Sequence, residues 1–365
     1  MQKLLPHKFS QYGPALAVGD VNGDGLDDFF ISGSYGNSGK FFLQKKDGQF
    51  ETKDILPSAN FTTKQTEDAG VLLFDADGDN DLDLYITSGG YENKNGSLNY
   101  EDRFYENDGK GNFTLDSFAI PKSVISKSCI KAADYDKDGD LDLFVGGRVM
   151  PEKYPLSVSS FIFRNDSKKG ICRFTDVTKN IAPALINCGL TCDMLWTDFD
   201  NDGWVDIMIA GEWMPITFLK NEKGLFKNLK SEILHLKSSG WWNSLTAGDF
   251  DNDGDIDYVA GNVGLNSFYK ASATYAAKIY GFDFNDDGGY DAIPTIYLPD
   301  INNELKEFPA FGRDDMIKQM IGFKARFTNY KKLCTGTYFK NFICRRNKKI
   351  FATAGCKFFK QLYKK

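Results

Sequence analysis

Apolar residues along this chain occur in short runs that end in glycine. The clearest runs are "LYITSGG" (84–90), "LFVGGRV" (143–149), "IMIAGEW" (207–213) and "YVAGNVG" (258–264). Runs of about four to six apolar residues bounded by glycine are typical of buried strands rather than of helices. The hydrophobic pattern therefore predicts an all-β protein.

An aspartate-rich segment precedes each of these runs, and it occurs six times. The third copy reads "DYDKDGDLD" (134–142), and the copies start at Asp20, Asp75, Asp134, Asp198, Asp249 and Asp283. Positions 1, 3, 5 and 9 are always Asp, except that position 3 is Asn22 in the first copy and Asn285 in the last. Position 6 is Gly in five copies and Asn80 in the second. Both residue types tolerate the left-handed backbone of a sharp turn.

The residue types at these positions predict a Ca²⁺ site in each segment. Position 7 has no common side chain, as expected if it contributes only its backbone carbonyl. Four side-chain oxygens and one carbonyl are hard ligands, and they suit Ca²⁺ better than softer metals. The predicted ligands are Asp20, Asn22, Asp24 and Asp28; Asp75, Asp77, Asp79 and Asp83; Asp134, Asp136, Asp138 and Asp142; Asp198, Asp200, Asp202 and Asp206; Asp249, Asp251, Asp253 and Asp257; and Asp283, Asn285, Asp287 and Asp291.

Three alternatives fit the segments less well. Mg²⁺ demands stricter octahedral geometry than Ca²⁺. Asp, Asn and Gly also mark hairpin turns that bind no ion, but that explanation weakens when six copies occur in register. An EF-hand requires a glutamate at position 12, where this chain has Ile31, Ile86, Val145, Ile209, Ala260 and Pro294. The segments are therefore predicted to be calcium loops that join strands.

A second hairpin is predicted after each of the first four loops. The segments are "FFLQKKDGQF" (41–50), "RFYENDGKGNF" (103–113), "FIFRNDSKKGICRF" (161–174) and "ITFLKNEKGLF" (216–226). Each has a strand, a polar turn and an aromatic strand, which is a hairpin pattern. The first four intervals between loops, of 55, 59, 64 and 51 residues, each have room for one four-stranded sheet. Radial repetition of such sheets predicts a β-propeller.

These residues resemble a known family. Loops preceded by stretches such as "YGPALAVGD" (12–20) and "WWNSLTAGD" (241–249) resemble the FG-GAP repeats of integrin α propellers and bacterial VCBS repeats. The hairpins "RFYENDGKGNFT" and "FLKNEKGLF" resemble secreted or surface-attached bacterial proteins that also carry an ASPIC/UnbV module, akin to cartilage acidic protein. The resemblance covers about residues 5–330.

The resemblance implies a propeller of about six or seven blades, with calcium loops on one face and ligand binding elsewhere. It also implies an extracellular or cell-surface binding or scaffolding module, with a protein or carbohydrate ligand.

The pattern changes near the C-terminus. The last two loops are only 34 residues apart, which leaves open whether a blade is trimmed or a hairpin is skipped. Apolar spacing predicts a short helix near 314–326, where Arg313, Asp314 and Asp315 are either functional or ordinary helix-start residues. Residues 331–365 form a basic tail, interpreted as a non-native or frameshifted end or, alternatively, as a membrane-binding or nucleic-acid-binding arm.

Charge and hydropathy exclude several function classes. Residues 331–365 hold eleven Lys and Arg and no acidic residue, so residues 1–330 carry 33 basic and 50 acidic side chains, a net charge of −17. A body this acidic argues against nucleic acid and suits cations. No apolar run approaches the roughly 18 to 20 residues of a transmembrane helix, and the first twenty residues lack a signal-peptide core.

Enzyme chemistry has little support in the sequence. His7 and His235 are the two histidines, and neither lies in a recognisable catalytic motif. Glu152 and Glu212 are carboxylates outside the loops that follow buried strands; they are either rim residues or the acids of a polysaccharide lyase or hydrolase, the alternative function. Trp213, Trp241 and Trp242 are expected either in a ligand surface or in the core.

Overall fold

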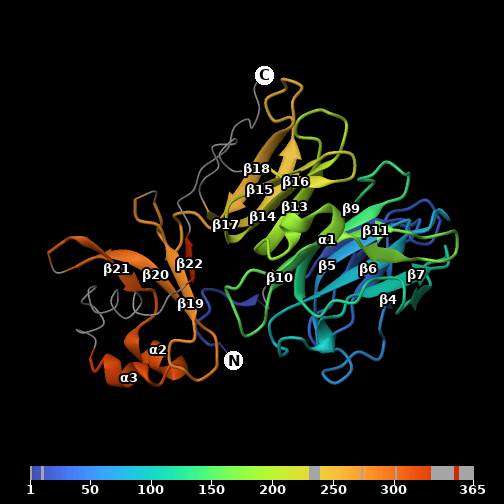
Figure 1. Ribbon diagram of the computed structural model, residues 1–365. Helices are drawn as coiled ribbons and strands as arrows, with labels where there is room; N and C mark the ends of the chain where they lie inside the picture. The colour runs from blue at the N-terminus through green and yellow to red at the C-terminus, as the bar shows by residue number, and fades with distance from the viewer. Residues whose placement is uncertain are drawn as a thin grey trace.

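The computed structural model describes residues 2–9, 12–229, 239–272, 274–300 and 302–329, and the backbone of 349–352. The described residues form five antiparallel sheets and a few short helices (Figure 1). None of the helices in the described ranges is long and apolar enough to cross a membrane.

The first three sheets each contain four strands that neighbour one another in chain order. They are β1 (Leu16–Gly19), β2 (Asp28–Ile31), β3 (Lys40–Gln44) and β4 (Phe50–Asp54); β5 (Glu67–Phe74), β6 (Asp83–Gly89), β7 (Arg103–Asn107) and β8 (Phe113–Leu115); and β9 (Ser126–Ala133), β10 (Asp142–Val149), β11 (Phe161–Asn165) and β12 (Phe174–Asp176). In each sheet the aspartate loop joins the first two strands, and the predicted second hairpin forms the last two.

The fourth sheet repeats this unit and then continues into the next. Its strands are β13 (Leu190–Thr197), β14 (Asp206–Met214), β15 (Thr217–Asn221) and β16 (Phe226–Asn228), followed by β17 (Gly240–Gly248) and β18 (Asp257–Asn262). The start of β17 pairs with the end of β14 through Trp241 and Glu212, so six strands form one sheet. Short helical turns occur at η2 (Leu98–Tyr100), α1 (Thr178–Ile181) and η3 (Pro183–Leu185).

The last sheet lies to one side of the others, at the left of Figure 1. It contains β19 (Lys278–Phe282), β20 (Asp291–Pro299), β21 (Leu305–Pro309) and β22 (Lys349–Ala352), in the order β21-β20-β19-β22. The predicted helix near 314–326 is present as two short helices, α2 (Arg313–Gln319) and α3 (Phe323–Arg326). Strand β22 comes from the basic tail; residues 331–348 and 353–365 lie outside the described residues.

The described residues between the fifth and sixth loops form no second hairpin. Strand β18 ends at Asn262 and β19 begins at Lys278, and the described residues between them form no strand. The short interval between the last two loops is therefore explained by a skipped hairpin.

The core consists of apolar layers between successive sheets. The layer between the first two sheets contains Phe30 and Phe41 with Leu84 and Tyr105, and similar clusters lie between the second and third, third and fourth, and fourth and fifth hairpin units. The first strands of successive units, β1, β5, β9, β13 and β17, lie next to one another around the centre. A four-stranded sheet buries its faces only against its neighbours, so the arrangement is that of the predicted β-propeller.

The last sheet packs against the centre of the propeller through the N-terminal segment. Ile279 and Ala292 share a buried cluster with Phe9, Trp213 and Trp241. Leu4 packs among residues of β19, β20 and the helices, and its backbone N–H donates to Gln319 Oε1 at 2.8 Å. The first nine residues therefore connect the two parts of the molecule.

In the second, third and fourth sheets, an asparagine at the end of the third strand joins the sheet to the one before it. Asn165 Nδ2 donates to the carbonyl oxygen of Ala76 in the previous unit at 2.9 Å and to that of Leu141 in its own unit at 3.3 Å. Asn107 and Asn221 make the same two kinds of bond, with distances of 2.8 to 3.1 Å. In the first sheet this position is Gln44.

We predict that Asn165→Ala destabilises the protein by about 2 to 4 kcal/mol, because two carbonyl groups in a buried interface lose their donor. The free energy of unfolding in urea measures this. The exposed Asn112→Ala is the control and is expected to cost less than about 1 kcal/mol. Equal losses in the two variants would contradict a role for Asn165 between the sheets.

Candidate metal centres

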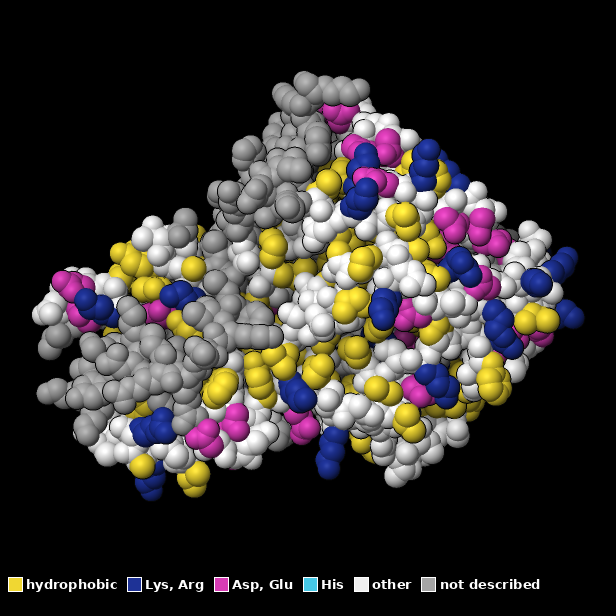
Figure 2. Space-filling view, viewed as in Figure 1, with side chains coloured by type: hydrophobic (Ala, Val, Ile, Leu, Met, Phe, Trp, Pro, Cys, Tyr) yellow, Lys and Arg dark blue, Asp and Glu magenta, His cyan; other side chains and the backbone are white. Residues whose placement is uncertain are grey.

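All six aspartate loops lie at the same end of their sheets, because each joins the first strand of a unit to the second. Figure 2 shows acidic side chains in several groups at the upper right of the view, with basic side chains beside them. The loops share one hydrogen-bond frame, in which positions are counted from the first Asp.

The aspartates at positions 1 and 5 hold the turn. The carboxylate at position 1 accepts the backbone N–H of position 6 at 2.7 to 3.1 Å in all six loops. The carboxylate at position 5 accepts the N–H of position 7 over the same range of distances. These bonds fold the chain so that the remaining carboxylate oxygens face one another.

The aspartate at position 9 is buried in every loop, whereas the other ligand positions are mostly half-buried or exposed. One of its oxygens accepts the backbone N–H of position 2 at 3.0 to 3.3 Å. In the first four loops the other oxygen accepts an N–H from the second hairpin, for example from Asn165 to Asp142 at 2.8 Å. Position 9 thus ties the loop to its own sheet.

Two residues of each loop have left-handed backbone. At position 6, φ lies between 74° and 100°, as the Gly and Asn residues there predict. Position 4 also has positive φ in every copy, in Gly23, Gly78, Lys137, Asn201, Asn252 and Asp286. The left-handed backbone at position 4 was not predicted, although the glycines and asparagines there were a usable signal.

Four loops bring three carboxylates together, with one oxygen from each lying within 4.8 Å of the others. In the second loop these come from Asp75, Asp77 and Asp79; in the third, fourth and fifth they come from positions 1, 3 and 9. Among the described residues the first and last loops form no such group, since Asn22 and Asn285 replace a carboxylate at position 3. Each of the four groups could hold a metal ion.

Several carboxylate oxygens in these loops are buried and have no hydrogen-bond partner. They are Oδ1 of Asp77 and Asp81 in the second loop, of Asp134 and Asp136 in the third, and of Asp200 in the fourth. A buried carboxylate oxygen without a donor is costly, and a cation would satisfy it. The residues present therefore fit a metal ion.

Burial and mutual repulsion raise the pKa of several loop carboxylates. Burial is the largest cause for Asp81, and the nearby Asp79, Asp77 and Asp75 add to it, raising its pKa to about 6. Burial raises the pKa of Asp83, Asp142 and Asp206 to about 7, although backbone N–H groups oppose the shift. A cation at the loops would favour the ionised forms.

A second polar cluster lies at the opposite end of the sheets, around Glu212 of β14. The Glu212 side chain is fully buried; Arg148 donates to its Oε1, and Tyr154 donates to its Oε2 at 2.9 Å. Nε2 of His7 lies 2.8 Å from Oε1. Burial alone would raise the pKa of Glu212, but Arg148 and His7 outweigh it and lower the pKa to about 2.

This cluster corrects two expectations. Glu212 is neither a rim residue nor the free acid of a hydrolase, because it lies at the centre with its charge compensated. His7, which showed no recognisable setting in the sequence, is its neighbour; the partners lie about 200 residues apart in the chain, so no local motif links them. His235 lies outside the described residues. Glu152 lies in the turn that follows β10.

The three tryptophans and the two acidic residues at the start of α2 have structural roles. Trp213, Trp241 and Trp242 are buried, with exposures of 5%, 7% and 2%, so they are core residues. Asp314 and Asp315 lie in the first turn of α2, where carboxylates favour the helix N-terminus.

We predict that Glu212→Gln costs about 3 to 5 kcal/mol at pH 7, because it leaves Arg148 buried without a counter-charge. The folded-state pKa of about 2 lies below the ordinary 4.5, so the ionised carboxylate stabilises the fold above pH 4.5, and that contribution is lost as the pH falls toward 2.

The difference in unfolding free energy between the parent and Glu212→Gln should therefore shrink between pH 4.5 and pH 2. Urea unfolding across that range measures it, with the exposed Glu222→Gln as control. A difference that does not change with pH would contradict an ionised Glu212.

Comparisons with solved structures give distant likenesses. The chain is 14% identical to a lectin of Agrocybe aegerita described as recognising non-reducing terminal N-acetylglucosamine, with 94% of this chain and 86% of the lectin covered and a TM-score of 0.43. It is 14% identical to the V. cholerae biofilm matrix protein Bap1, with 76% of this chain and 46% of that protein covered and a TM-score of 0.35. No curated protein sequence matches the chain.

A family model does match the repeats. The FG-GAP-like repeat matches residues 20–86, 75–145 and 198–260, which together make up more than half of the chain. These ranges contain five of the six loops; only the loop that starts at Asp283 lies outside them. The chain therefore belongs to the family of FG-GAP-like repeat proteins.

Proposed function

We propose that the aspartate loops bind Ca²⁺ and that the propeller is a calcium-stabilised binding module at the cell surface or outside the cell. The observation that carries the proposal is the set of buried carboxylate oxygens without donors, held in a hydrogen-bond frame that repeats six times. In the third loop, for example, one oxygen of Asp134 accepts the N–H of Gly139, and its other oxygen, Oδ1, is buried without a hydrogen-bond partner.

The predicted ligands of each site are the side chains at positions 1, 3, 5 and 9 and the backbone carbonyl of position 7. In the third loop these are Asp134, Asp136, Asp138 and Asp142, with Asp140 at position 7. Bound Ca²⁺ supplies positive charge that offsets the repulsion among the carboxylates, and it tolerates irregular oxygen cages better than Mg²⁺ does.

The affinity expected for these calcium loops supports a location at the cell surface or outside the cell. Extracellular calcium modules work with dissociation constants of about 10⁻⁴ to 10⁻³ M, which half-exposed loops of this kind suit. The strong negative charge of residues 1–330 also favours cations over nucleic acid as partners. If the loops hold structural ions, a protein or carbohydrate ligand would bind elsewhere on the propeller.

We expect CaCl₂ to raise the melting temperature by at least about 5 °C relative to EGTA, since one site filled at 100 times its dissociation constant contributes about 2.7 kcal/mol. A thermal melt followed by circular dichroism measures this, with MgCl₂ at the same concentration for comparison. Asp136→Asn should reduce the rise, whereas the exposed Asp47→Asn should not.

Identical melts in CaCl₂ and EGTA, for a sample that folds, would contradict calcium sites. An equal rise in MgCl₂ would contradict selectivity for calcium.

A lysine side chain reaches the fourth loop. Lys220 of β15 pairs with Asp200, and its Nζ lies 3.0 Å from Asp202 Oδ2. Hydrogen bonds to these two carboxylates raise the pKa of Lys220. The ammonium group therefore competes with a metal ion for the same oxygens.

We predict that Lys220→Met raises the metal affinity of the fourth loop about fivefold to tenfold, because the competing charge is removed. Tb³⁺ luminescence excited through Trp204 measures it: Trp204 occupies position 7 of this loop and also contacts Lys137 of the third loop, so the change between the parent and Lys220→Met is assigned to the fourth loop. Lys227→Met, an exposed lysine of the same hairpin that pairs with Glu222, is the control. An unchanged affinity in Lys220→Met would contradict the competition.

A further inference from the structure

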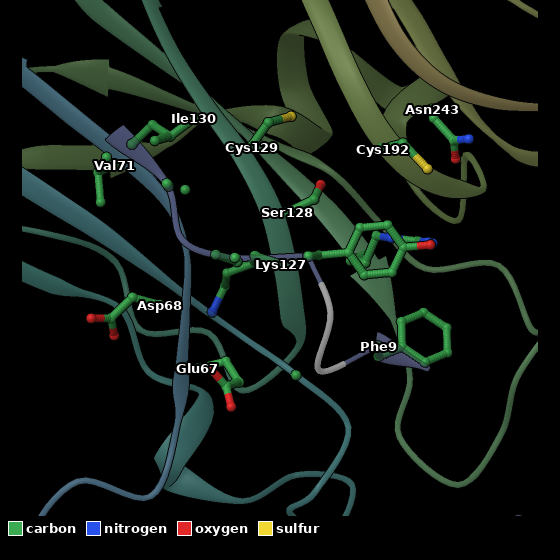
Figure 3. Close-up of a pocket in the computed structure, with 17 residues that line it drawn as sticks. Phe9, Glu67, Asp68, Val71, Lys127, Ser128, Cys129, Ile130, Cys192 and Asn243 are labelled. Carbon is green, nitrogen blue, oxygen red and sulfur yellow. The ribbon is translucent and has the colours of Figure 1, made fainter. Parts of the chain in front are cut away.

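A cavity of about 260 Å³ lies at the centre of the propeller, at the end of the sheets opposite the aspartate loops. Its walls come from the starts of β5, β9, β13 and β17, the first strands of four successive units, and from the N-terminal segment at Phe9 and Tyr12. Figure 3 shows Ser128 of β9 in the middle of the view, with Asn243 and Cys192 on one side and Asp68 and Glu67 on the other.

Arg148 lines this cavity and has one N–H group, at Nη1, without a hydrogen-bond partner. Its side chain is 5% exposed and lines the cavity, with Phe9 and Tyr12 rings 5.0 Å from the guanidinium carbon. Nη2 donates to Glu212, but Nη1 is buried and has no hydrogen-bond partner among the described residues. Burying an N–H group without an acceptor is costly, so a ligand that brings an oxygen acceptor to Nη1 would be favoured.

Three of the four charged side chains that line the cavity are paired within the protein. Arg148 pairs with Glu212. Nζ of Lys127 lies 3.1 Å from Oδ1 of Asp102, and Nζ of Lys64 lies 3.1 Å from Oδ1 of Asp68. Glu67 is half-buried, and burial raises its pKa. The walls therefore do not select strongly for an ion of either sign.

The remaining lining combines hydrogen-bonding groups with apolar surface. Asn243 is an exposed amide that offers both a donor and an acceptor, and the Glu67 carboxylate offers an acceptor. Val71 and Ile130 provide apolar walls. The volume is slightly below the roughly 300 Å³ at which typical ligand pockets begin, so the cavity suits a ligand of one ring.

We propose that this axial cavity binds one neutral sugar residue, with a ring or hydroxyl oxygen at Arg148 Nη1 and a hydroxyl group at Asn243. Sugar hydroxyls both donate and accept hydrogen bonds, and the C–H faces of the ring match the apolar walls. The inference deepens the proposed function, because it names the ligand class of the binding module and rests on that function.

The experiment is a binding titration of the full chain in CaCl₂ with glucose, galactose, mannose, N-acetylglucosamine and glucuronate. Saturation-transfer NMR detects weak binding directly, and tryptophan fluorescence reports it through Trp241, which packs in one cluster with Phe9. We expect at least one neutral sugar to bind with a dissociation constant of about 1 mM or below.

Asn243→Ala should weaken that binding about fivefold to tenfold, the loss of one hydrogen bond, whereas the exposed Asn95→Ala should leave it unchanged. Arg148→Lys keeps a positive charge beside Glu212 but removes Nη1, and it should also weaken binding. A thermal melt of each variant separates loss of binding from loss of the fold.

Absence of binding by every neutral sugar would overturn the proposal, as would binding that Asn243→Ala does not change. Glucuronate binding more than tenfold tighter than glucose would replace the neutral class by a carboxylate and would also overturn it. If calcium raises the melting temperature but no sugar binds, this inference alone fails. If calcium does not change the melting temperature, the proposed calcium sites fail instead.

Discussion

The rest of the propeller depends on the hydrogen bonds that the buried aspartate at position 9 of each loop accepts. In the third unit, Asp142 accepts the N–H of Tyr135 in its own loop and the N–H of Asn165 in the second hairpin. The side chain of Asn165 then reaches the carbonyl of Ala76 in the preceding unit. One carboxylate thus fixes the loop, orders the hairpin and, through the asparagine, sets the distance to the preceding sheet. Because buried polar groups must be satisfied, these positions tolerate few other residues.

The same arrangement explains why so much like charge is placed at one end of the fold. In the third loop, one oxygen of Asp134 holds the turn, whereas its Oδ1 and the Oδ1 of Asp136 are buried without a hydrogen-bond partner. Hydrogen bonds therefore order the loop, but its carboxylate groups lack a compensating positive charge. Folding and cation binding are coupled in such a site, since a cation adds to the stability of the folded chain only.

Local patterns in the sequence predicted the fold and the loops, whereas long-range contacts could not be read from it. The loop strands and all four second hairpins lie where the apolar and polar spacing placed them. Position 4 of the loops was missed although its Gly and Asn residues signalled a left-handed backbone. The contacts of Glu212 with Arg148 and His7 had no local signal, because they join an N-terminal segment and two different sheets. The helix pattern near 314–326 identified a helical region but not the break between its two short helices.

Although the loops share one frame, they are not electrostatically equivalent. The residue that precedes the hairpin asparagine or Gln44 is Leu43, Glu106, Arg164 and Lys220 in the first four units. Glu106 adds negative charge near Asp77, whereas Lys220 pairs with two carboxylates of its loop. A single position on the third strand thus changes the charge of the loop without altering the hydrogen bonds that shape it. The repeat can therefore keep its geometry in every unit while the attraction for a cation differs from one loop to the next.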